Sequence, residues 1–172
     1  AIQVLTAKGL SAPERLGNLI NVLTTSTGMP YGICSGQGWE SEKTIDLSSY
    51  HKLKTASLFV AATKMGAISA GEDPEPWAEL GQRIGEAFQV ADDLKDFSDS
   101  QKSGKSNNRD MENERPNAVL KLGEQGAIKR LQDILAGAIA SIPSCPGEVE
   151  LIKIVRSQAE RLTPVEPLQK TL

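Results

Sequence analysis

The chain has 172 residues, 39% of them hydrophobic and 24% charged, so it is long enough for one domain with a proper core. Its formal net charge of −3 gives no electrostatic footprint for nucleic acid or for an anionic membrane. Cys34 and Cys145 lie far apart without a CxxC pair or a histidine cluster, which argues against a zinc site or a disulfide framework and fits a cytoplasmic protein.

Apolar residues recur at helical spacing along the chain, and no strand-like alternation competes with that pattern. Aromatic residues make up only 4% of the sequence, and alanine, leucine and isoleucine fill the apolar positions, which favours closely packed helices over a sheet. The helices predicted in chain order span about residues 15–27, 29–36, 50–70, 75–97, 118–122, 124–140 and 147–162. We therefore predict a single all-α domain over residues 1–172, and no apolar run reaches the ~18 residues of a membrane-spanning helix.

The segment from Ser98 to Asn117 differs from the rest of the chain in composition, because Met111 is almost its only apolar residue. Its cations are Lys102, Lys105, Arg109 and Arg115. A connection longer than ~12–15 residues without structure is unusual in a compact domain and is most often an active-site lid or a disordered linker. We favour the lid, because the segment directly follows a cluster of aspartates.

The most informative stretch runs from Gly85 to Asp96 and places three aspartates in a largely apolar helical pattern. One stripe of this helix is polar and consists of Gly85, Gln89, Asp92 and Asp96, so we expect that stripe to face an enclosed cavity. Carboxylates this close repel one another, and a divalent cation with oxygen ligands compensates them. Mg²⁺ fits best, because it binds through one or two carboxylates plus substrate phosphates. The alternative is a solvated acidic helix end, which the flanking Phe-Gln pair and the glycine on the stripe disfavour.

Residues 85–97 read GEAFQVADDLKDF, which resembles the second aspartate-rich motif of the trans-polyprenyl diphosphate synthases, the head-to-tail prenyltransferases. Residues 50–56 resemble the Lys-Thr helix of that family, and residues 35–37 resemble its Gly-Gln step. Gly104-Lys105 resembles its basic loop after the aspartates. The resemblance runs over nearly the whole chain in the family's order, and it implies an isoprenoid synthase-type helical bundle.

Two further segments, GWESE at 38–42 and RPNAV at 115–119, are similar to geranylgeranyl diphosphate synthases of bacterial carotenoid and bacteriochlorophyll pathways. The family also has an earlier DDxxD motif followed by an Arg-Arg pair, whereas this sequence contains only one DDxxD and no such pair. The chain begins at Ala1 in an apolar run without an N-cap signal. We therefore interpret it as the C-terminal part of a longer protein and expect this chain alone to be inactive.

The resemblance implies a reaction in which a Mg²⁺-bound allylic diphosphate ionises, the allylic cation alkylates isopentenyl diphosphate, and a proton leaves. Lys54 and Thr55 would be catalytic residues that bind the allylic diphosphate. Gln89 would be a further catalytic and substrate-binding residue that supports the aspartates by hydrogen bonds. The implied metal site consists of Asp92, Asp93 and Asp96. In it the first and last aspartates would hold the ion, and the middle one would orient a water bound to it.

Further residues have weaker assignments. Lys105 and Arg115 would close over the same diphosphate, although many relatives have lysine where Arg115 stands. Gln37 lies near the reacting chain in the family, and a capping role for it is equally open. We interpret His51 as a surface residue rather than a general base, because the departing diphosphate can accept the product proton. The resemblance also implies a homodimer.

Two other functions stay open at this point. One is a non-catalytic partner subunit that binds a complete synthase and changes its product length. The other is a terpene synthase-like enzyme on the same fold, which shares the metal chemistry but usually lacks the FQxxDD context. A second DDxxD motif upstream in the parent gene would favour the prenyltransferase.

Overall fold

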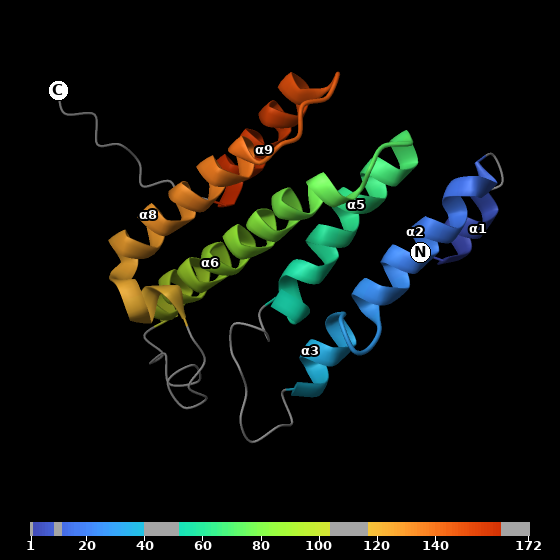
Figure 1. The fold of residues 1–172 in the computed structure, drawn as a ribbon. Helices are drawn as coiled ribbons and strands as arrows, with labels where there is room; N and C mark the ends of the chain where they lie inside the picture. Colours follow the sequence, from blue (N-terminus) through green and yellow to red (C-terminus); the bar gives the residue numbers. More distant parts are fainter. Residues whose placement is uncertain (1, 9–11, 40–51, 104–116, 163–172) are drawn as a thin grey trace.

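The computed structural model describes residues 2–8, 12–39, 52–103 and 117–162, and the regular structure within these ranges is helical (Figure 1). The α-helices are α1 (Ile2–Lys8), α2 (Pro13–Thr27), α3 (Ile33–Trp39), α5 (Ser57–Ala70), α6 (Ala78–Ser103), α8 (Ala118–Ala140) and α9 (Glu148–Leu162). A π-helical turn, η2 (Lys52–Ala56), precedes α5, and a 3₁₀ turn, η3 (Glu75–Trp77), precedes α6. The prediction of an all-α fold is confirmed.

The longer helices pack in chain order, α2 on α5, α5 on α6, α6 on α8 and α8 on α9 (Figure 1). The main core lies between α6 and α8. On α6 it uses Ala87, Val90, Ala91 and Leu94, whose spacing of three and four residues makes one apolar stripe. Leu131 of α8 is fully buried in the same cluster. Burial of one leucine side chain contributes about 1.5–3 kcal/mol, so this interface fixes the position of α6 and its aspartates.

A second buried cluster joins the start of α6 to the end of α8 and to α9. Its buried members are Leu80, Ala138 and Val155. Trp77 of η3 is partly buried and packs against them.

α5 and α6 approach closely at two glycines of α6. A Cβ atom on Gly81 would lie 2.5 Å from Val60 Cα, and one on Gly85 would lie 2.7 Å from Ala56 Cα. No side chain fits into such a gap, so these positions require glycine because of the neighbouring backbone. The contact at Gly85 brings the π-helical turn η2 directly onto α6.

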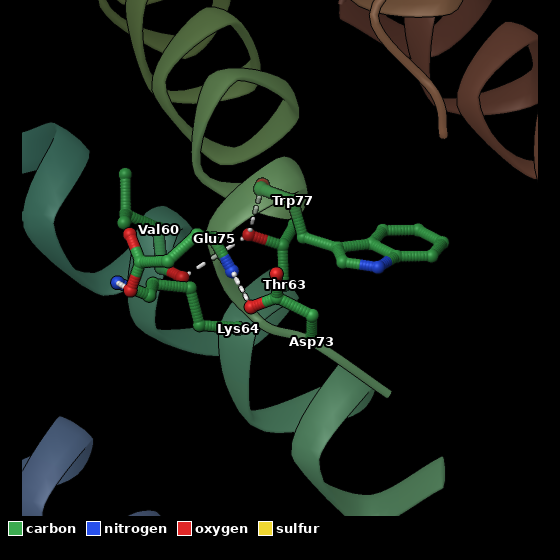
Figure 2. A network of polar contacts seen from close by, with 6 residues as sticks. All are labelled: Val60, Thr63, Lys64, Asp73, Glu75 and Trp77. Atoms are coloured by element: carbon green, nitrogen blue, oxygen red, sulfur yellow. Dashed lines mark hydrogen bonds and ion pairs between the residues drawn. The ribbon is translucent and has the colours of Figure 1, made fainter. Parts of the chain in front are cut away.

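Polar side chains close the connection between α5 and α6 (Figure 2). Thr63 Oγ1 donates to the Trp77 carbonyl oxygen at 2.8 Å, and Lys64 Nζ lies 2.6 Å from Glu75 Oε1. Asp73 Oδ1 accepts from the Glu75 N–H at 3.0 Å, which fixes the start of η3. We call Thr63, Lys64, Asp73, Glu75 and Trp77 the connection clasp.

Two predicted helices begin differently in the structure. The helix predicted at 29–36 begins only at Ile33, because a turn precedes it in which the Gly32 N–H donates to the Gly28 carbonyl at 2.8 Å. The helix predicted at 50–70 is described from Lys52, and its first five residues form the π-helical turn η2. Apolar spacing does not distinguish an α-helix from one π turn, so the sequence pattern missed this change.

The aspartate helix is longer than predicted. α6 continues to Ser103, so residues 98–103 of the predicted lid are helical. These residues are polar and have no apolar stripe, and they continue the helix from its packed part. The segment ends at Asn117, whose side chain caps α8. Residues 104–116, and with them the rest of the lid hypothesis, lie outside the described residues.

Candidate functional site

Lys54 and Thr55 lie on η2, between two helices that approach it closely. On the α3 side, a Cβ atom on Gly36 would lie 2.8 Å from the Lys54 backbone nitrogen. On the α6 side, Gly85 contacts Ala56. The turn is therefore fixed by backbone contacts on both sides, and π-helical turns occur frequently at functional sites. The side chains of Lys54 and Thr55 are both half-buried.

Gln89 joins this turn to the aspartate helix. Thr55 Oγ1 donates to Gln89 Oε1 at 3.3 Å, and Gln89 Nε2 donates to Asp93 Oδ1 at 3.2 Å. Gln89 and Asp93 are one helical turn apart on α6, so their contact follows from the helix itself. Thr55 lies 34 residues away from Gln89 in sequence, so their hydrogen bond depends on the packing of η2 against α6.

Asp93 is the buried member of the aspartate motif, with 8% of its surface exposed. Its Oδ2 atom accepts from the N–H of Ala118, the first residue of α8, at 2.7 Å. The Asn117 side chain accepts from the next two N–H groups at 2.9 and 3.2 Å. Two side chains thus satisfy three N–H groups that a helix start leaves without partners. We call the hydrogen bonds that run through Thr55, Gln89, Asp93 and Ala118 the hydrogen-bond bridge.

Asp92 and Asp96 differ from Asp93, because both are exposed on α6. Apolar side chains are exposed on the same helix and on α5. Phe88 is 44% exposed and its ring centroid lies 5.5 Å from that of Phe59, while Leu58 is 42% exposed. A surface that combines a lysine, carboxylates and exposed apolar groups suits a ligand with an anionic head and an apolar tail.

Comparison with known proteins assigns the family. The family model described as Polyprenyl synthetase matches residues 2–153. The chain belongs to the polyprenyl synthetase family. It is 56% identical over 165 residues to the geranylgeranyl diphosphate synthase of Cereibacter sphaeroides, and 52% identical over 164 residues to the geranylgeranyl diphosphate synthase of Rhodobacter capsulatus. Each match covers 95% of this chain and 57% of the relative.

A solved structure of a geranyltransferase from Legionella pneumophila has the same fold, with a TM-score of 0.70. The match covers 94% of this chain and 56% of that chain, at 20% sequence identity. The chain spans little more than half the length of the curated relatives that it matches.

The structure links three of the predicted site residues, Thr55, Gln89 and Asp93, by hydrogen bonds across the interface of η2 with α6. Lys54 directly precedes Thr55 on η2. Gln37 is exposed on α3. Three other predicted residues lie outside the described residues, namely His51, Lys105 and Arg115.

The prediction of an enclosed cavity around the polar stripe was wrong for the part of the chain that the structure describes. Asp92 and Asp96 are exposed, whereas Gly85 of the same stripe is buried. A cavity of about 650 Å³ lies instead at the other end of α5 and α6, beside the connection clasp, and small residues such as Ala62 and Gly66 line it. Helical periodicity places polar residues on one face, but it does not say what covers that face.

Within the described ranges, no group of three or more His, Cys, Asp or Glu side chains could hold a metal ion. Asp92 and Asp96 nevertheless offer the donor set that Mg²⁺ takes from a protein when water and phosphate complete its coordination. Both are oxygen donors, both are exposed, and they lie about one turn apart on α6. These two residues therefore fit Mg²⁺.

Two expectations from composition can be compared with the structure. Cys34 and Cys145 are free thiols, in agreement with the expected absence of a disulfide framework. Among the described helices, none is long and apolar enough to cross a membrane.

The bond between Asp93 and Ala118 was not predicted from the sequence. An asparagine directly before a helical run is an N-cap signal, and it locates the start of α8 at Asn117. The acceptor for the Ala118 N–H lies 25 residues upstream, where no local pattern reveals it. The contact between Gln89 and Asp93 has a visible signal, because the two residues are four apart on one helix.

Proposed function

We propose that the chain is the C-terminal part of a prenyltransferase that condenses an allylic diphosphate with isopentenyl diphosphate. The product we infer is a short-chain prenyl diphosphate, geranylgeranyl diphosphate in the first place, in line with 56% and 52% identity to two geranylgeranyl diphosphate synthases. The observation that carries this proposal is the hydrogen bond between Thr55 and Gln89, which joins the Lys-Thr turn to the aspartate helix.

Lys54 would bind the allylic diphosphate. Its backbone is fixed between α3 and α6, so the point from which the side chain extends toward the substrate is fixed. Negative charge develops on the departing diphosphate as the carbon–oxygen bond stretches. A fixed cation stabilises that charge more in the transition state than in the ground state, and this difference raises the rate. Thr55 and Gln89 would keep the turn aligned with α6.

Asp92 and Asp96 would hold Mg²⁺, because their exposed carboxylates are hard oxygen donors on one helix. When bound, the ion supplies positive charge that neutralises the diphosphate and makes it a better leaving group. The two carboxylates repel the anionic substrate when no cation is present. Diphosphate and Mg²⁺ should therefore each strengthen the binding of the other.

The apolar groups beside the site would cover the hydrocarbon part of the allylic substrate. Leu58 and Phe88 are exposed in this chain; Leu58 lies on α5, which directly follows the turn that carries Lys54, and Phe88 lies on α6 with the aspartates. Covering the reacting carbon with apolar groups excludes water, and electrostatic interactions are stronger where water is excluded.

Several finer assignments stay predictions. The closure of Lys105 and Arg115 over the diphosphate concerns residues outside the described ranges. The homodimer that the resemblance implies is a further prediction. A cytoplasmic location is in keeping with the two free cysteines.

The test is steady-state prenyl transfer by the full-length synthase with Asp92→Ala, Asp96→Ala and a matched control, Asp133→Ala. Asp133 is also an exposed aspartate, but it lies on α8 and pairs with Lys129 at 3.1 Å. Loss of a metal ligand should lower kcat/KM roughly 10²-fold or more, which corresponds to about 2.7 kcal/mol of transition-state stabilisation. The control should stay within about twofold, because exposed ion pairs contribute little.

Thermal unfolding should change little in all three variants, because all three carboxylates are exposed. Near-wild-type turnover of both site variants at saturating Mg²⁺ would contradict the assignment. The 172-residue chain alone should give no measurable product, because it carries one of the two aspartate motifs of the family that it resembles. Robust product formation by this chain would refute that expectation.

A further inference from the structure

The three aspartates of α6 lie in different environments, and the difference points to different tasks. We propose that Asp93 is a positioning residue, which sets the orientation of the Gln89 amide and fixes the start of α8. Asp92 and Asp96 then bind metal without it. The division of tasks rests on the function proposed for Asp92 and Asp96, whereas the role of Asp93 in the hydrogen-bond bridge does not.

Burial and bonding separate Asp93 from its neighbours. It is 8% exposed, and its two oxygens accept from Gln89 at 3.2 Å and from Ala118 at 2.7 Å. A buried carboxylate is costly unless N–H donors compensate it, and these two donors do so. A metal ion on the same oxygens would face both N–H donors at close range, and the positive groups would repel one another. Asp92 and Asp96 are exposed and are not members of the hydrogen-bond bridge.

The chemistry of the groups fixes the direction of each hydrogen bond in the bridge. A backbone N–H can only donate, so Asp93 accepts from Ala118, and its carboxylate is an acceptor at both oxygens. Gln89 must therefore present its NH₂ group to Asp93. The Gln89 carbonyl then faces Thr55, whose hydroxyl donates its single proton to it.

The direction of these hydrogen bonds determines what the turn η2 can offer to a bound anion. The proton of the Thr55 hydroxyl is used by Gln89, so it is not available to an anion bound beside the turn. The positive charge offered to such an anion comes from Lys54. The hydrogen-bond bridge also connects Ala118, the first residue of α8, to η2. Asp93 therefore holds both η2 and the start of α8 in position on α6.

Asp93→Asn should reverse the direction of the hydrogen bonds from residue 93 through Gln89 to Thr55, whereas Asp93→Ala should remove the bonds of residue 93. The introduced amide keeps its oxygen toward the Ala118 N–H and presents its NH₂ group to Gln89. Gln89 then has to rotate its own amide, so that its carbonyl accepts and its NH₂ group faces Thr55. The start of α8 stays anchored in Asp93→Asn, and only the direction of the remaining bonds changes.

NMR of ¹⁵N-labelled protein without ligands tests this reversal. Exchange of the Ala118 amide should be at least about tenfold faster in Asp93→Ala, because a bond to a charged acceptor is lost, and within about threefold of the parent in Asp93→Asn. The nuclear Overhauser effect between the Gln89 side-chain NH₂ and the Thr55 methyl should be weak in the parent and strong in Asp93→Asn. A purely structural role for Asp93 would not change that signal. Unchanged Ala118 exchange in Asp93→Ala, or an unchanged Gln89 signal in Asp93→Asn, would overturn the proposal.

Calorimetric titration of the full-length protein with Mg²⁺ and inorganic diphosphate separates this inference from the proposed function. Asp92→Asn should weaken Mg²⁺ binding at least about tenfold, whereas Asp93→Asn should weaken it by a clearly smaller factor, because Asp93 does not touch the ion. An equal loss in both variants would overturn the division of tasks. If Asp92→Asn binds normally while the NMR reversal occurs, the metal site is refuted and the positioning role of Asp93 stands.

Discussion

α5 and its preceding turn are joined to α6 at two ends by different kinds of contact, and Figure 2 shows one of them, the connection clasp. At the connection clasp, Lys64 and Glu75 are 11 residues apart in sequence, and Thr63 and Trp77 are 14 apart. In the hydrogen-bond bridge, Thr55 lies 34 residues from Gln89, and the bond that enters α8 spans 25 residues. The clasp forms around a short turn, whereas the bridge forms only after three separate segments have packed.

The two ends also differ in burial, and therefore in the cost of losing a contact. The ion pair of the clasp is largely exposed at Glu75, and exposed pairs contribute about 0–1 kcal/mol. The bridge is buried at Asp93, where a polar group left without its partner costs about 1–3 kcal/mol. Substitutions at the two ends should therefore affect stability and activity in different proportions.

The largest effect is expected from Gly85→Ala at the bridge end. The new methyl group would lie 2.7 Å from Ala56 Cα, so η2 has to move away from α6 and the Thr55–Gln89 bond is lost. We expect about 1–3 kcal/mol less stability in urea unfolding and at least a roughly tenfold lower kcat/KM of the full-length protein. Gly17→Ala is the control, because nothing lies within 4 Å of a Cβ atom there. Equal behaviour of the two variants would show that the close contact at Gly85 is unimportant.

A paired substitution of two threonines should separate the two ends. Thr55→Val removes a donor of the bridge, and we expect a roughly tenfold loss of kcat/KM with a small change in stability. Thr63→Val removes the bond to the Trp77 carbonyl, and we expect about 1 kcal/mol less stability with activity within about twofold. Both variants are measured by urea unfolding and by steady-state kinetics. A similar loss of activity in both would remove the functional distinction between the ends.

The smallest effect is expected from Lys64→Ala in the clasp. Its ion pair with Glu75 measures 2.6 Å, but the Glu75 side chain is 72% exposed. We expect a loss of about 0.5 kcal/mol in urea unfolding, and salt near 1 M should reduce the difference further. A loss above about 2 kcal/mol would mean that the clasp determines the packing of α5 on α6.

Much of the fold could be predicted from the sequence, because apolar periodicity and helix breakers are local signals. The break predicted between residues 122 and 124 occurs at Gly123, which has a φ of 72° inside α8. The continuation of α6 to Ser103 could not be predicted, because residues 98–103 carry no apolar stripe. The start of α3 at Ile33 was missed for a related reason, since the preceding turn depends on backbone hydrogen bonds.

The site could be predicted only in part. The residue types at Lys54, Gln89 and Asp92 were recognised from short motifs, and their roles stay predictions. Helical spacing leaves Asp93 off the polar stripe of Asp92 and Asp96, but it does not say that Asp93 is buried or which donors it meets. Its bond to the Ala118 N–H joins two helices across 25 residues, and only the packed structure brings the two groups together.

A crystal structure of the full-length protein with Mg²⁺ and a diphosphate is the most direct test of the division among the aspartates. We predict oxygens of Asp92 and Asp96 at about 2.1 Å from Mg²⁺, the distance typical of this ion. We also predict that Asp93 lies outside the coordination sphere and keeps its bonds to Gln89 and Ala118. Coordination of Mg²⁺ by Asp93, with the bond to Ala118 broken, would contradict the account.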